Sequence, residues 1–187
     1  LGSGFVESVR TEQELWTVSI MGQEPIASSG IMINNIAVSL NAMIGGVTQY
    51  IPQIPVITPP GAFTVYLLVF NGIMIGCVCA RTAQVNLAYD LLAFVSAHGA
   101  LELPAIFLAG GAGLLLARAI LLNGKYRRLD ALKLYGLQAA KLLYGIVPLL
   151  FIASCIEGFF SPQTWIPNAV KYVVGMAIFI IIVHILI

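Results

Sequence analysis

Long apolar runs, separated by short polar segments, dominate the chain. The apolar runs cover residues 30–51, 61–80, 104–122, 134–157 and 169–187. A helix that crosses a bilayer needs about 20 predominantly apolar residues, and each run meets that length. Strands of a membrane barrel would instead alternate polar and apolar residues over about 10 positions. The pattern therefore predicts an all-α, polytopic helical membrane protein with about five to six spans.

The N-terminal 25 residues differ from the rest because they hold four of the eight acidic residues. Apolar residues recur among them at roughly helical spacing, and Trp16 suits the depth of the lipid headgroups. We expect either an amphipathic helix on the membrane surface or a helix packed on another part of the protein. The predicted organisation is an arm over residues 1–29 and a transmembrane domain over residues 30–187.

A polar stretch, residues 82–103, interrupts the apolar pattern. Arg81 precedes it, and the loop 123–133 that follows the next apolar run holds four of the nine basic residues. Basic residues favour the cytoplasmic side, so both ends of 82–122 are expected there. An even number of crossings then follows, which predicts a helical hairpin or re-entrant loop with both chain termini cytoplasmic. If Arg81 faces outward instead, the chain has five plain spans and its termini lie on opposite sides.

Three ionisable residues, His98, Glu102 and Glu157, lie in otherwise apolar surroundings. Such residues are costly in a membrane unless they are paired, line water or serve a function. The hairpin would bring its tip and the end of the 134–157 run to similar depth, so we expect all three to meet near the outer end of the bundle.

Each of these residues also has a structural interpretation. Pro104 favours a helix start, so Glu102 would lie near that helix N-terminus and cap it. His98 would be a buried imidazole, and Glu157 would simply end a helix. The functional alternatives are a divalent metal site or a proton relay. Asp90 is a further candidate, either for a polar path or for a pair with Arg118.

Composition excludes several classes of protein. The chain is 59% hydrophobic and 9% charged with a net charge of +1, which gives no nucleic-acid footprint. No nucleophile elbow, phosphate loop or dinucleotide fingerprint occurs, and no cofactor is expected. Small residues at Gly72, Gly76, Ala109 and Gly113 permit close helix packing. On that basis we expect a homo-oligomer, most simply a dimer.

Four sequence blocks resemble the stage II sporulation protein M family of integral membrane proteins. The blocks are NNIAVSLNAMIGG (34–46), NGIMIG (71–76), HGALELPAIFLAGGAGLLL (98–116) and IASCIEGFFSP (152–162). The resemblance implies a multi-span protein of the bacterial cytoplasmic membrane without established catalysis. The family's namesake is a scaffold that recruits peptidoglycan-degrading partners. The resemblance gives weight to the residues that stand in the shared blocks: Asn34, Asn35, His98, Glu102, Pro104 and Glu157.

The leading functional hypothesis is a non-enzymatic membrane scaffold or regulator, whose partners are the lipid bilayer and other membrane or envelope proteins. The second is a transporter or channel with a polar path at Asp90, His98 and Glu102. The third is an intramembrane metal-dependent enzyme.

Overall fold

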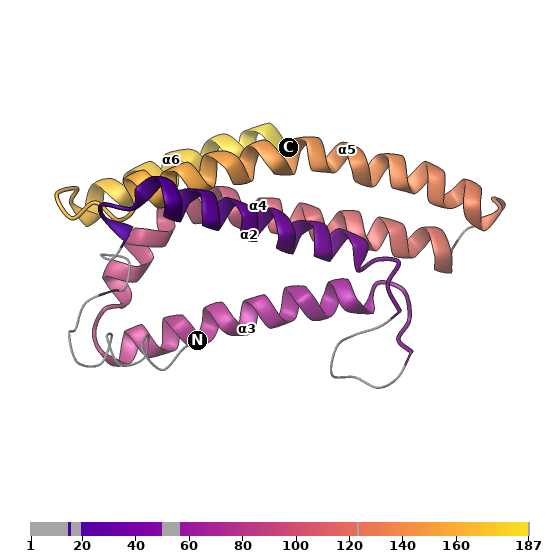
Figure 1. Cartoon of the computed structure of the whole chain (residues 1–187), viewed down its shortest axis with the longest axis horizontal. Helices are drawn as coiled ribbons and strands as arrows, with labels where there is room; N and C mark the ends of the chain where they lie inside the picture. Colours follow the sequence, from indigo (N-terminus) through magenta and orange to yellow (C-terminus); the bar gives the residue numbers. More distant parts are fainter. Residues whose placement is uncertain (1–14, 16–19, 50–56, 123, 187) are drawn as a thin grey trace. The chain divides into compact units, whose positions relative to one another are not determined.

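The computed structural model describes residues 15, 20–49, 57–122 and 124–186, which form helices and turns and no strand. The helices are α2 (Glu24–Ile44), α3 (Ala62–Gln84), α4 (Ala88–Leu121), α5 (Arg128–Cys155), the π-helical turn η2 (Ile156–Phe160) and α6 (Asn168–Leu186) (Figure 1). Within this part of the chain, five helices are long and apolar enough to cross a membrane, when α5 and η2 are taken as one. The prediction of an all-α polytopic fold is confirmed.

The predicted hairpin over residues 82–122 is wrong, because α4 is one continuous helix of 34 residues with Pro104 inside it. At 1.5 Å per residue this helix is roughly 51 Å long, more than a ~30 Å hydrocarbon core requires. Membrane helices tolerate an internal proline when neighbouring groups satisfy the freed carbonyls. The inference that both termini are cytoplasmic depended on the hairpin and loses its basis.

Several boundaries also differ from the predicted ones. α2 begins at Glu24 and ends at Ile44, so it starts and ends earlier than the 30–51 run. α5 begins at Arg128, which places part of the predicted 123–133 loop within a helix. A tight link at residues 85–87 joins α3 to α4, and Asn86 there has a φ of 62°. Most of the predicted N-terminal surface helix lies outside the described residues.

The chain divides into two compact units. Unit 1 contains Leu1–Ile33, Met74–Glu102 and Phe151–Ile187, and unit 2 contains Asn34–Ile73 and Leu103–Leu150. Four helices therefore pass from one unit to the other. α4 changes unit beside Pro104 and α5 changes unit near Pro148, and both prolines lie well inside their helices.

Small residues allow close packing in unit 2. Its core contains Ala42, Ala105, Ala109, Ile146 and Leu150. The buried Thr64 hydroxyl donates a hydrogen bond of 2.7 Å to the Ala42 carbonyl.

The predicted close packing is present at Gly113, which ends the glycine run of α4 at residues 110–113. A Cβ at that position would meet the Ala42 carbonyl oxygen and the Thr64 side chain. By contrast, a Cβ added at Gly72 or Gly76 would meet no atom within 4 Å, so neither glycine supports packing inside its unit.

Candidate functional site

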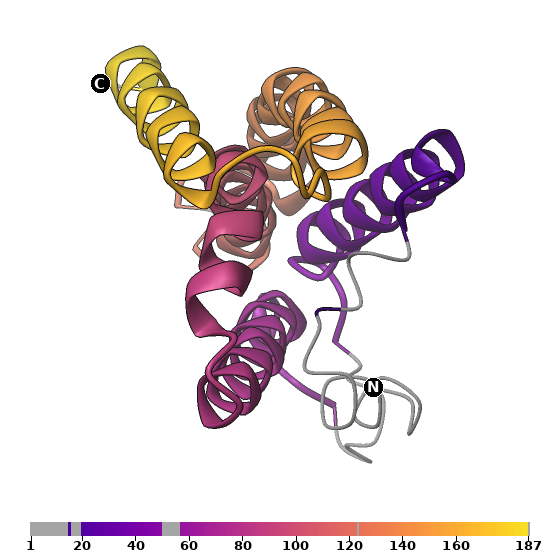
Figure 2. The same ribbon diagram turned by 90° about the vertical axis from the view of Figure 1, so that its left-hand side faces the viewer.

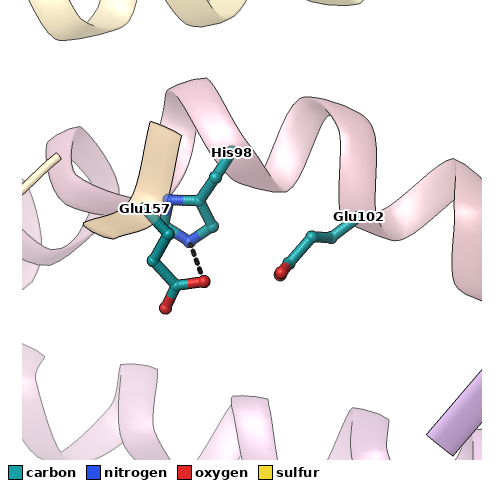
Figure 3. Close-up of side chains that lie close together, drawn as sticks. All are labelled: His98, Glu102 and Glu157. Atoms are coloured by element: carbon teal, nitrogen blue, oxygen red, sulfur yellow. Dashed lines mark ion pairs between the residues drawn. The ribbon is translucent and has the colours of Figure 1, made fainter. Parts of the chain in front are cut away.

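His98, Glu102 and Glu157 come together in unit 1. One potential ligand atom from each of them lies within 4.8 Å of the other two. The His98 Nε2 atom is 3.9 Å from Glu157 Oε2, and the side chains are 4% and 18% exposed. Figure 3 shows His98 and Glu102 projecting from one helix toward Glu157. The carboxyl groups of Glu102 and Glu157 are therefore close enough to repel each other when both are ionised, and a proton or a cation between them would relieve that repulsion.

The continuous helix α4 explains why two of these residues share a face. His98 and Glu102 are four residues apart, and residues at that spacing lie one above the other on a helix. The expectation that Pro104 would separate Glu102 from His98 as the cap of a new helix is wrong, because α4 continues through both.

Glu157 reaches the cluster from η2. This turn is wider than an α-helical turn, as the hydrogen bond of 2.8 Å from Ser161 N to the Ile156 carbonyl spans five residues. Gly158 is buried, and a Cβ there would lie 2.6 Å from the Ser28 Cβ. Glycine is therefore needed for η2 to lie against the start of α2, and that contact fixes the position of Glu157.

Ser161 connects the cluster to α6. Its hydroxyl forms a hydrogen bond of 3.1 Å with His98 Nδ1, and its carbonyl accepts one of 2.7 Å from Lys171 Nζ. The Phe94 ring meets the His98 ring edge-on, with 5.2 Å between their centroids. These contacts hold the imidazole so that Nε2 faces the carboxyl groups.

Polar contacts also connect α6 to the first part of α4. Figure 2 shows that α6 begins beside this part of α4. The Ser96 hydroxyl donates to the Lys171 carbonyl over 2.9 Å. A Cβ at Gly175 would lie 2.5 Å from the Ser96 carbonyl oxygen, so the two helices touch through backbone. The Asn168 amide donates to Asp90 Oδ1 over 2.6 Å.

The remaining predicted residues lie apart from the cluster. Asp90 bonds Asn168 rather than Arg118, whose guanidinium lies 5.6 Å from the centre of the Tyr135 ring, so the predicted Asp90–Arg118 pair is wrong. Asn34 and Asn35 are in unit 2, where the Asn34 amide donates to the Asn35 side chain over 3.3 Å. Pro104 lies within α4, in the part assigned to unit 2.

Sequence reasoning missed two residues that complete the site, Ser161 and Lys171. Lys171 could have been recognised from the sequence, because a lysine inside an apolar run is expected to have a specific partner. Ser161 carried none, because a serine in a polar loop is ordinary and its contact with His98 spans 63 positions of sequence.

The family model described as stage II sporulation protein M matches residues 3–162. This range includes His98, Glu102, Glu157 and Ser161, whereas Lys171 lies beyond it. No curated protein and no solved structure matches. The match covers most of the 187 residues, so the chain belongs to the stage II sporulation protein M family.

Proposed function

We propose that the protein is a non-enzymatic scaffold that organises other membrane or envelope proteins at the bacterial cytoplasmic membrane. The observation that carries this proposal is how unit 1 uses its polar side chains. Asp90 bonds Asn168, Ser96 bonds the backbone at Lys171, and the Ser28 hydroxyl donates to the Ser154 carbonyl over 2.9 Å. These side chains join one helix to another, as a rigid platform requires.

The same contacts argue against the transport hypothesis. A transporter needs polar groups that line a path and exchange partners as a solute passes. Asp90, one of the three residues expected to line that path, is already held by an amide at 2.6 Å. His98 is 4% exposed and bonds Ser161.

The family supports the proposal as well. The namesake of the stage II sporulation protein M family is a scaffold for partners that degrade peptidoglycan, and we extend the scaffold role, though not sporulation, to this chain. We further propose that the chain works as a homodimer. Exposed apolar side chains are abundant on helices such as α6, where they face either lipid or a second copy.

An exchange of the Asp90–Asn168 pair tests the proposed function. In the double variant Asp90→Asn/Asn168→Asp, the hydrogen bond is retained but the carboxylate moves to α6. We expect in-cell cross-linking to capture the same set of membrane proteins with the exchanged variant as with the unchanged chain. We also expect the variant to rescue a deletion strain, because a scaffold requires the fold and not the position of one carboxylate.

Two results would contradict this proposal. The first is a folded exchanged variant that loses rescue while the unchanged chain, reconstituted in vesicles, moves ions or solutes. The second is a chain that cross-links only to itself. The expression level and the elution profile in detergent report whether the variant is folded.

We also propose a membrane orientation in which the α4–α5 connection is cytoplasmic. Four basic residues lie there, Lys125 and Arg127 before α5 and Arg128 and Lys133 within its first turns. If each of the five helices crosses once, the link between η2 and α6 lies outside, and the two ends of the helical region lie on opposite sides.

Cysteine labelling checks this orientation. With Cys77, Cys79 and Cys155 replaced by alanine, we expect an impermeant thiol reagent to miss Tyr126→Cys in intact cells and to label Trp165→Cys. Both native side chains are exposed, at 57% and 77%. Gly124 is less suitable, because its φ of 57° strains any other residue. The reverse labelling pattern would invert the orientation.

A further inference from the structure

We propose that His98, Glu102 and Glu157 form a binding site for one divalent transition-metal ion, for which Zn²⁺ is the best-matched probe. This inference goes beyond the scaffold proposal, which requires no cation. The donor set is one imidazole and two carboxyl groups, with ligand atoms within 4.8 Å of one another. Imidazole and carboxylate together suit zinc and its neighbours better than calcium or magnesium, which take oxygen ligands.

The distances fit a shared ion. Zinc lies about 2.0–2.2 Å from nitrogen and oxygen ligands, so two ligands of a tetrahedral site are about 3.4 Å apart. His98 Nε2 and Glu157 Oε2 are 3.9 Å apart, which is too long for a direct hydrogen bond. The 3.9 Å separation, and the 4.8 Å within which all three ligand atoms lie, both exceed that ligand–ligand separation, so the carboxylate side chains would move toward the ion when it binds. Three protein ligands would leave a fourth position for water or another group.

The surroundings of His98 provide a second, independent observation. A histidine that binds a metal usually donates its other ring N–H to a nearby acceptor, which fixes the tautomer. Here Nδ1 forms a hydrogen bond of 3.1 Å with the Ser161 hydroxyl, and the Phe94 ring packs against the imidazole. When Nδ1 is the donor, Nε2 presents a lone pair toward the carboxyl groups. A lone pair facing a carboxylate is repulsive, so this arrangement favours a cation between them.

Charge balance agrees with a divalent ion. The cluster itself holds the carboxyl groups of Glu102 and Glu157 and the imidazole of His98. With both carboxyl groups ionised and a neutral imidazole, its net charge is −2. Asp90 and Lys171, in the neighbouring parts of α4 and α6, carry opposite charges that cancel. Buried charges need compensation in an apolar segment, and one divalent cation supplies it.

Zinc titration of the full chain tests the inference. The detergent-solubilised protein is stripped with a chelator, dialysed and titrated with Zn²⁺. We expect one tightly bound ion per chain by elemental analysis, and an X-ray absorption spectrum with nitrogen and oxygen ligands that include one imidazole. Glu102→Gln, which keeps the side-chain shape, should weaken zinc binding at least 100-fold. Ser161→Ala, which removes the partner of Nδ1, should weaken it about 10–100-fold.

Matched controls are available outside the cluster. His184→Gln and Asp130→Asn each remove an exposed group of the same type and should leave zinc affinity unchanged. The inference is overturned if the folded, unchanged chain takes up no zinc, or if Glu102→Gln binds zinc as tightly as the unchanged chain. A spectrum without imidazole also overturns it, and this readout needs no variant. Because partner cross-linking can be repeated in chelator, failure of the metal site and failure of the scaffold role are distinguishable.

Discussion

Gly113→Ala is expected to destabilise the protein by about 1–3 kcal/mol, the usual range for an overpacked core. The added methyl group would lie 2.6 Å from Thr64 Oγ1 and would also meet the Ala42 carbonyl oxygen. The hydroxyl can rotate away, but the carbonyl belongs to the backbone of α2 and cannot move without shifting that helix. We therefore expect an effect near the upper end of the range, measured as a lower thermal midpoint in detergent.

Gly111→Ala is the matched control, since it lies in the same glycine run of α4 and nothing approaches within 4 Å of a Cβ there. Alanine is a better helix former than glycine by up to about 1 kcal/mol, so this variant should be neutral or slightly stabilising. Equal losses at both positions would mean that the contact between the end of α2 and α4 in unit 2 does not limit stability.

Glu157→Ala should also be strongly destabilising. Removing one partner of a buried charged set costs about 3–5 kcal/mol, because the remaining groups are left uncompensated. Glu157 is 18% exposed, so we expect about 3 kcal/mol, the lower end of that range. Glu157→Gln keeps the shape of the side chain and leaves no cavity, and should therefore cost less. Thermal unfolding in detergent measures both variants.

Asp130→Ala and Asp130→Asn are the matched controls for this series. Asp130 is an exposed carboxylate in the first turn of α5, where a negative charge contributes a few tenths of a kcal/mol up to about 1 kcal/mol. If Glu157→Ala unfolds at the same temperature as Asp130→Ala, the cluster has no structural role in unit 1.

The helices were predictable to the extent that apolar length defines them. Runs such as 61–80 and 169–187 correspond closely to α3 and α6, because uninterrupted apolar sequence leaves no alternative to a helix in lipid. The exception is α4. Its polar first half has the pattern of a hairpin tip, but these side chains are satisfied by residues such as Asn168 and Ser161, which lie more than 60 positions away in sequence. The pattern of residues within one segment does not indicate which distant residues will be its partners.

The members of the site were partly predictable for a different reason. His98, Glu102 and Glu157 stand out because ionisable residues are rare in apolar runs, and rarity can be seen in a single sequence. The geometry that joins them could not be seen. It depends on α4 continuing through Pro104 and on the wide turn of η2, neither of which has a residue pattern that predicts it.

Lys171 has a consequence for biosynthesis. An ammonium group is among the most costly side chains to pass into a bilayer, and Lys171 lies in the first turn of α6. Its acceptor, the Ser161 carbonyl, lies ten residues earlier in the chain. Ser161 therefore leaves the ribosome before Lys171 does, so its carbonyl has been synthesised by the time α6 enters lipid. The order of synthesis thus allows Lys171 to find its acceptor as α6 inserts.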